Sequence, residues 1–113
     1  MKYPLFQRDL VLIDFPFSKM TESKVRPVIV MSTDEYNNKF DDFIAIPLTS
    51  RLDDREYAFL ITNKEMESGR LKFDSRVKVD RIYSLEQKDV TKKFGKIKKE
   101  FHKKLRESLL QVI

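Results

Sequence analysis

An arginine at the start of a β-branched run is the feature of this sequence that is best suited to chemistry. Arg26 lies between Val25 and Pro27, and three strong strand formers follow from Val28 to Val30. Pro27 donates no backbone hydrogen bond, so it fits the first residue of a strand. A guanidinium fixed at the mouth of a buried strand suits the recognition of a phosphate, because its fork grips two oxygens. The alternative is a surface arginine beside a strand.

Several other chemistries have no support in the sequence. There is no cysteine, which excludes disulfides and thiolate catalysis. No cluster of His, Cys and carboxylates has the spacing of a metal site, so we expect neither a metal nor another cofactor. With two glycines in the chain, no glycine-rich phosphate loop exists. The single histidine, His102, follows an apolar position of the terminal helix and is expected to be a surface or interface residue.

Composition and charge narrow the class of protein. The chain has 113 residues and 41% hydrophobic residues, which predicts one packed domain spanning residues 1–113. No apolar run approaches the roughly 18 residues of a membrane span, and the absence of cysteine suits the cytoplasm. Residues 1–56 hold eight Lys/Arg and ten Asp/Glu, whereas residues 57–113 hold fifteen and eight. This basic second half indicates a polyanion or an acidic protein as partner, although it serves solubility equally well.

The elements that must position Arg26 follow from hydrophobic patterning. Short apolar or alternating runs predict six strands, at residues 8–15, 25–32, 42–49, 57–62, 75–83 and 90–97. The last is rich in lysine, as expected of an exposed edge. A helical turn is expected at residues 34–38, capped by Thr33 or Asp34, and a loop with one helical turn at residues 63–73.

A helix is predicted over residues 98–110. Ile97, Phe101, Leu105 and Leu109 recur every four residues and form one apolar stripe. Short strands followed by one terminal helix predict an α+β fold, mainly β, in which the helix packs on a small antiparallel sheet or barrel.

Five stretches match one known family in order. They begin with an Asp-apolar strand leading to Asp14-Phe15, and continue with an Arg-Pro-apolar strand, a Pro-Leu-Thr-Ser loop, a Val-x-x-Asp-x-Ile strand and a Gly-x-Ile before the helix. These stretches are Asp9–Phe17, Lys24–Val30, Ile46–Arg51, Val77–Ile82 and Lys93–Ile97. In this order and spacing the chain resembles the MazF/PemK toxins of type II toxin–antitoxin systems.

The resemblance implies an SH3-like barrel with a terminal helix, usually as a homodimer in the cytoplasm. It implies a metal-independent endoribonuclease that cleaves single-stranded RNA and is held inactive by a cognate acidic antitoxin. The family's catalytic Arg and Thr carry over to Arg26 and Thr49. Electrostatic stabilisation of the phosphate suits Arg26 better than proton donation, because a guanidinium barely deprotonates. Thr49 and Ser50 offer hydroxyls to the phosphate or the 2′-OH, or serve only local turn bonding.

Further RNA contacts are expected from Arg76 and Lys78, which share one face of their strand about 7 Å apart. Asp80 on the same face is a candidate general base or a brace for Arg26, and the alternative for the whole row is a solvated strand face. Lys24 and Arg51 flank the two main motifs and are candidate RNA ligands. Phe17 is a candidate platform for base stacking, unless it belongs to the core.

The loop before Arg26 lacks the histidine that some family members carry, which excludes a two-histidine mechanism and leaves the general base open. Two rival functions remain. One is a toxin of the same fold that poisons gyrase through protein contacts of its terminal helix. The other is an inactive homologue that binds RNA or antitoxin without cleavage. The Arg-Pro and Pro-Leu-Thr-Ser motifs favour the nuclease.

Overall fold

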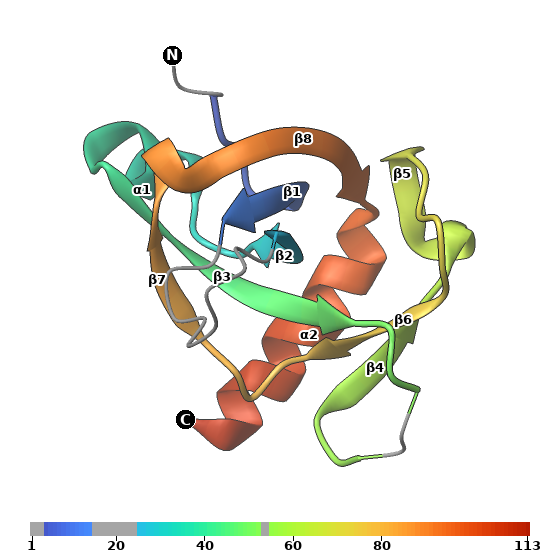
Figure 1. Ribbon diagram of the computed structural model, residues 1–113. Coiled ribbons are helices and arrows are strands. Elements are labelled where there is room, and N and C mark those ends of the chain that lie inside the picture. Colours follow the sequence, from blue (N-terminus) through green and yellow to red (C-terminus); the bar gives the residue numbers. More distant parts are fainter. Residues whose placement is uncertain (1–3, 15–24, 53–54) are drawn as a thin grey trace, which may run out of the picture.

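The computed structural model describes residues 4–14, 25–52 and 55–113, and Figure 1 shows their arrangement. In chain order the elements are β1 (Asp9–Asp14), β2 (Val25–Val30), α1 (Asp34–Lys39), β3 (Asp42–Thr49), β4 (Ala58–Ile61), the 3₁₀ turn η1 (Asn63–Glu65), β5 (Met66–Gly69), β6 (Ser75–Lys78), β7 (Tyr83–Glu86), the 3₁₀ turn η2 (Gln87–Asp89), β8 (Val90–Ile97) and α2 (Lys99–Val112).

The strands form one antiparallel sheet in the order β4-β6-β3-β2-β1-β8-β5, and β7 also pairs with β3. Figure 1 shows this sheet curling around β1 and β2, with α2 behind β3. The expected α+β architecture, mainly β with a terminal helix, is therefore confirmed. The predicted strands at residues 8–15, 25–32, 42–49 and 57–62 correspond to β1 to β4, and Thr33 caps α1 by accepting a hydrogen bond from the Tyr36 amide.

Two apolar cores lie on opposite faces of the curled sheet. The core under α2 contains the predicted stripe, because Ile97, Phe101 and Leu105 are buried in it and Leu109 packs against it. The second core lies against the other face of β1, β2 and β3. Successive side chains of β2 alternate between them, since Ile29 belongs to the first core while Val28 and Val30 belong to the second. The β-branched run is thus buried on both faces and holds the start of β2 in place.

The strand predicted at residues 75–83 is interrupted. β6 pairs with β3 at Leu48↔Val77, and β7 resumes along the same strand at Ala45↔Tyr83. Between these two pairs lie residues 78–82 of this segment but only residues 46 and 47 of β3. The three extra residues make the chain bulge out between Lys78 and Tyr83. Pro47 of β3 lies in this gap, and it has no N–H to donate to a ladder. The bulge carries Asp80 away from β3.

Two other predictions are corrected. The segment expected to be a loop at residues 63–73 contains β5 as well as η1. Its Gly69 has φ +75° and pairs with Gly95, where a Cβ atom on Gly69 would lie 2.1 Å from the Phe94 carbonyl oxygen. β5 therefore covers β8, so β8 is not the edge strand that its lysines suggested.

A membrane span requires a long apolar helix, and the described part of the chain contains none.

Candidate functional site

Arg26 and Thr49 lie on one face of neighbouring strands. β2 pairs with β3 at Val28↔Pro47, Ile29↔Ile46 and Val30↔Ala45, and two more residues in this register place Arg26 opposite Thr49. Side chains directly opposite in an antiparallel pair have Cβ atoms about 5 Å apart. Arg26 is exposed and Thr49 is half-buried.

Thr49 has a second cationic neighbour on its other side. The register of β3 with β6 pairs Thr49 with Arg76, and Lys78 lies two residues further along the same face of β6. Val77, which lies between Arg76 and Lys78, and its β3 partner Leu48 point to the other face, since both are buried in the core under α2. Thr49 therefore has Arg76 as its partner on β6, and the extension of the β2–β3 register brings Arg26 to its other side.

Thr49, Arg76 and Lys78 belong to the lining of a small pocket of about 230 Å³, here called the basic pocket, whereas Arg26 lies outside this lining. Its lining residues are Thr49, Arg51, Arg55, Ala58, Arg76 and Lys78. Four of the six are cationic and none is acidic, so the pocket suits an anion. Ala58 faces Lys78 across the β4–β6 pair, and its small side chain leaves space between the longer ones.

The Thr49 hydroxyl is oriented by the backbone. Its Oγ1 accepts a hydrogen bond from the Arg51 amide at 3.2 Å. This is the turn bonding that the sequence left open as an alternative, but it does not exclude a second role. Because Oγ1 accepts from the amide, its own hydrogen remains available to donate to an anion in the pocket.

Asp80 pairs with Arg55. The Arg55 guanidinium lies 2.6 Å from Asp80 Oδ2, and the Asp80 side chain is only 18% exposed. Asp80 thus braces Arg55 where the sequence suggested a brace for Arg26. Arg55 was missed because it lies in a charged turn whose residues resemble ordinary loop. Only the tertiary contact with Asp80, through the bulge after β6, identifies it as part of the pocket.

The remaining predicted residues lie in three places. Arg51, Arg76 and Lys78 line the basic pocket, and Ser50 is exposed next to Thr49. Lys24 and Phe17 lie outside the described residues. Within the described part of the chain, no group of three His, Asp or Glu residues has the geometry of a metal site.

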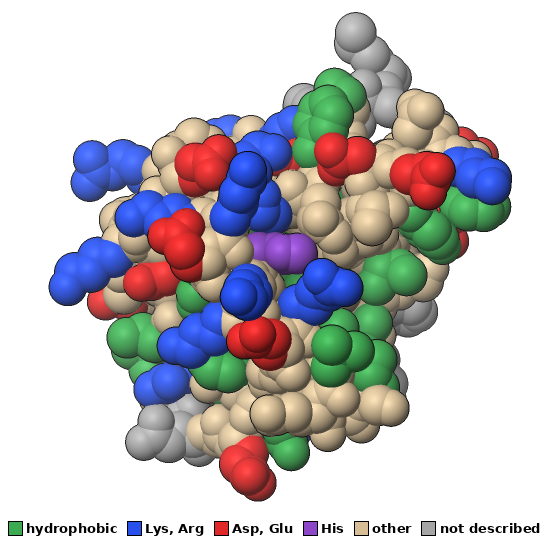
Figure 2. Space-filling model, turned by 180° about the vertical axis from the view of Figure 1, so that it is seen from behind, with side chains coloured by type: hydrophobic (Ala, Val, Ile, Leu, Met, Phe, Trp, Pro, Cys, Tyr) green, Lys and Arg blue, Asp and Glu red, His purple; other side chains and the backbone are tan. Residues whose placement is uncertain are grey.

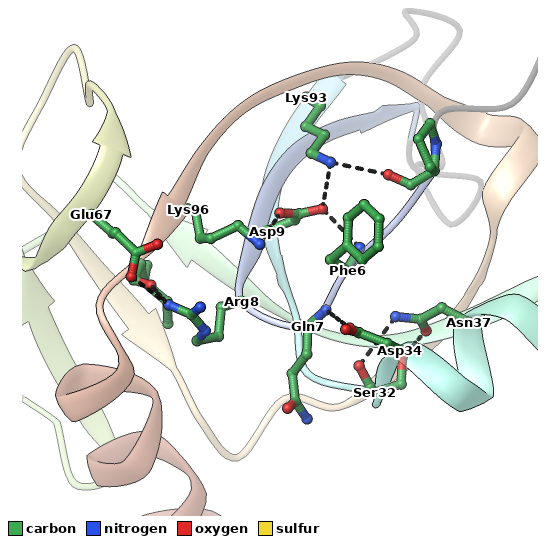
Figure 3. A network of polar contacts seen from close by, with 12 residues as sticks. Phe6, Gln7, Arg8, Asp9, Ser32, Asp34, Asn37, Glu67, Lys93 and Lys96 are labelled. Atoms are coloured by element: carbon green, nitrogen blue, oxygen red, sulfur yellow. Dashed lines mark hydrogen bonds and ion pairs between the residues drawn. The ribbon is translucent and has the colours of Figure 1, made fainter.

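Two lysines of the basic second half, Lys93 and Lys96, form ion pairs with Asp9. Asp9 is fully buried and lies 2.9 Å from Lys93 Nζ and 3.1 Å from Lys96 Nζ. It also accepts a hydrogen bond from the Phe6 amide, and both ammonium groups lie over the Phe6 ring. Figure 3 shows this group, here called the Asp9 network, at the start of β1. These two lysines therefore neutralise a buried charge and stabilise the fold.

His102 lies on α2, behind the sheet. Figure 2 shows it at the centre of that face, among Lys and Arg side chains. Burial lowers the pKa of His102, and the nearby Arg8 and Arg106 lower it further. It is half-buried, and its position on this face separates it from the basic pocket.

Comparisons with known proteins identify the family and the fold. The model of the PemK-like, MazF-like toxins of type II toxin–antitoxin systems matches residues 6–113. No curated protein matches the chain. Among solved structures, MazF in a MazE–MazF complex from Deinococcus radiodurans is 20% identical with a TM-score of 0.80, and the alignment covers 97% of this chain and 96% of the other.

A second similar structure is a mycobacterial endoribonuclease in complex with its cognate antitoxin. It is 14% identical with a TM-score of 0.77, over 96% of this chain and 93% of the other. At these identities the structures establish a common fold, and the family model extends from just before β1 to the C-terminus. The chain belongs to the PemK-like, MazF-like toxins of type II toxin–antitoxin systems.

Proposed function

We propose that this toxin is an endoribonuclease that cleaves single-stranded RNA in the basic pocket. The observation that carries the proposal is the position of Thr49 between Arg26 and Arg76, at the rim of a pocket lined by four cations. A phosphodiester bound there receives donors from three strands. The similar mycobacterial and Deinococcus structures, described as an endoribonuclease and as MazF, support the same reading.

In the proposed reaction a general base removes the proton of the 2′-hydroxyl, and the 2′-oxygen attacks the adjacent phosphorus. The P–O5′ bond breaks, a 2′,3′-cyclic phosphate forms, and the 5′-oxygen leaves with a proton. Negative charge builds on the non-bridging oxygens, where Arg26 donates two hydrogen bonds and Thr49 donates one. Preorganised donors of this kind contribute about 10²- to 10³-fold each to the rate. No step requires a metal ion.

Arg76, Lys78 and Arg55 bind the neighbouring phosphates. Such contacts position the strand and carry no sequence information. Asp80 acts through Arg55, which it holds at the pocket. In the cell, we infer a cytoplasmic toxin domain over residues 1–113, active as a homodimer and inhibited by an acidic antitoxin that competes for the same cationic surface.

Mapping the cleavage ends on a long transcript, with and without EDTA, tests the proposal. We expect discrete cuts that persist in EDTA, and a loss of at least about 100-fold in rate for Arg26→Ala. Arg106→Ala is the matched control, because it removes an exposed arginine from α2 behind the sheet. Intact RNA with the wild-type protein, or equal growth inhibition by wild type and Arg26→Ala, would overturn the nuclease.

A gyrase-type mechanism is the second candidate, because α2 ends in exposed apolar residues. The exposed fractions are 63% for Leu110, 40% for Val112 and 79% for Ile113. A toxin that acts through this end would keep its toxicity in Arg26→Ala and lose it when Leu110 and Ile113 are changed to Ser. The same growth assay therefore separates the two functions.

A further inference from the structure

A second hollow lies on the opposite face of the strands that form the basic pocket. It has a volume of about 310 Å³, and we call it the apolar groove. Its lining residues are Leu12, Pro27, Leu48, Arg70, Leu71, Lys72, Phe73, Ser75, Lys92 and Phe94. Strands β1, β2 and β3 supply its floor, and the connection between β5 and β6 supplies one wall.

The groove and the basic pocket are adjacent because strand side chains alternate. Leu48 lines the groove and its neighbour Thr49 lines the pocket. In β6, Ser75 lines the groove and Arg76 lines the pocket. Consecutive Cα atoms are about 3.8 Å apart, so only the thickness of one strand separates the two hollows. A chain molecule held at Thr49 reaches the groove by crossing the end of β3.

The wall of the groove is held in place by specific contacts. The Asn63 side chain accepts a hydrogen bond from the Leu71 amide at 2.8 Å and donates one to the Leu71 carbonyl at 3.4 Å. Ser75 Oγ donates to the Phe73 carbonyl at 3.2 Å. Gly69, with its positive φ and its close approach to Gly95, directs the chain into this wall. The groove is therefore preformed, which lowers the entropic cost of binding.

The lining combines aromatic faces with positive charge. Phe94 packs partly against the core, whereas Phe73 is 69% exposed at the wall. Arg70, Lys72 and Lys92 are the charged lining residues, and no carboxylate lines the groove. An apolar floor beside aromatic rings, rimmed by cations alone, fits a flat ring that carries phosphates on its flanks.

We propose that the apolar groove binds the nucleobase next to the cleaved bond and sets the base preference of the cut at that position. This inference rests on the proposed nuclease activity and assigns a second site to the same substrate. The base inserts against Phe73 and Phe94, and its flanking phosphate pairs with Lys72 or Lys92. Stacking alone accepts every base, so selectivity comes from the fixed width of the groove between the wall and β3.

Cleavage by Phe73→Ala tests the proposal. The ring is mostly exposed, so its removal leaves the core intact. Loss of a stacked base predicts about tenfold slower cleavage at the preferred sites, together with a changed base preference on one side of the cut. Phe40→Ala is the matched control, since Phe40 is also exposed, at 47%, and follows α1. It should cut at wild-type rates and sites.

Lys92→Ala provides a second, independent variant, with the exposed Lys88→Ala as its control. It should slow cleavage several-fold, more at low salt than at high salt. If the wild type cleaves RNA while Phe73→Ala and Lys92→Ala match it in rate and cut-site profile, the groove assignment is overturned and the nuclease stands. Variants that cut normally but bind a purified antitoxin more weakly would identify a peptide site instead. Intact RNA with the wild type overturns both proposals.

Discussion

The Asp9 network and the basic pocket both gather lysine or arginine side chains around a carboxylate, but their charges are balanced differently. Asp9 is fully buried, and Lys93 and Lys96 contact it from β8. At the basic pocket the Asp80 carboxylate pairs with Arg55, and the lining itself contains four cationic residues and no acidic one. If a buried carboxylate lost its partners, its charge would be unpaired and the free energy of unfolding would fall. A lining with more cations than carboxylates gives the pocket a positive potential that attracts an anion.

This difference separates structural from functional charges. Both clusters come from the same basic half of the sequence, together with residues from the first half. Burial and pairing distinguish them, and neither is visible in residue type or spacing. Each of the following variants is chosen so that its effect falls mainly on stability or mainly on activity.

The largest effect is expected on stability, from Asp9→Asn. The change leaves two ammonium groups without their counter-ion and weakens the bond from the Phe6 amide. We expect a loss of about 3 kcal/mol in the free energy of unfolding, because breaking a buried ion pair leaves charges uncompensated. Urea denaturation measures the loss, with activity followed per folded molecule.

Glu86→Gln is the control for this change, because Glu86 also pairs with a lysine, Lys88, but both side chains are mostly exposed. A surface pair contributes less than about 1 kcal/mol. Equal losses in the two variants, or a large fall in cleavage per folded Asp9→Asn molecule, would remove the distinction between the two clusters.

The next largest effect is expected on activity, from Thr49→Val. This variant keeps the branched shape and loses the hydroxyl that donates to the phosphate. We expect kcat/KM to fall about 100-fold, which corresponds to about 2.7 kcal/mol of transition-state stabilisation. The free energy of unfolding should fall by no more than about 1 kcal/mol, for the lost bond from the Arg51 amide.

Thr49→Ser is the rescue variant, because it restores the hydroxyl without the methyl group. It should recover most of the activity. If Thr49→Val is fully active, the hydroxyl serves only the turn, and the alternative that the sequence left open for this residue is correct.

Arg55 and Asp80 offer a smaller and more diagnostic effect. Arg55→Gln should raise KM several-fold at low salt, with less effect at high salt where exposed charges are screened. Asp80→Asn should cause a similar rise, because Asp80 acts by holding Arg55 at 2.6 Å. In the double variant the losses should not add, since both changes remove the same contact.

The same cycle tests the other role that the sequence allowed for Asp80. A general base would lose most of kcat when Asp80 is replaced, whether or not Arg55 is present, and KM would change little. That outcome would make Asp80 a catalytic residue and overturn its role as a positioning residue.

The sequence predicted the parts of the molecule that local patterns determine. β1, β2 and β3 were predicted by their apolar runs, and α2 by the four-residue recurrence from Ile97 to Leu109. The expected proximity of Arg26 and Thr49 also agrees with the β2–β3 register.

The rest depended on contacts between distant segments. β5 has no alternating pattern, and it forms because Gly69 and Gly95 let two backbones approach closely. The sequence does not reveal the break after β6, because the apolar/polar alternation continues through Val79. In the structure the Val79 amide donates a hydrogen bond to the carbonyl of Tyr57, which belongs to another segment. Arg55 joins the basic pocket only because this break carries Asp80 toward it. Sequence pattern indicates which face a residue occupies but not which segment meets that face.

The smallest effect is expected from His102, which belongs to neither charged cluster. Burial and the nearby Arg8 and Arg106 lower its pKa below the ordinary value of about 6.5. The unfolded chain therefore binds a proton more readily than the folded protein does. The free energy of unfolding should fall as pH decreases from about 6.5 toward the lower folded pKa, and should not depend on His102 above that range.

Urea denaturation at several pH values between 5 and 8 measures this dependence, and His102→Gln should flatten it. Glu67, whose pKa is lowered by its hydrogen bond from Arg8, also makes stability fall with decreasing pH, but in a more acidic range, below about pH 4.3. His102→Gln should leave cleavage unchanged at pH 7.5, because His102 lies behind the sheet and no histidine enters the proposed reaction. A loss of cleavage in this folded variant would extend the functional surface to α2 and break the separation drawn between the basic pocket and the remaining basic residues.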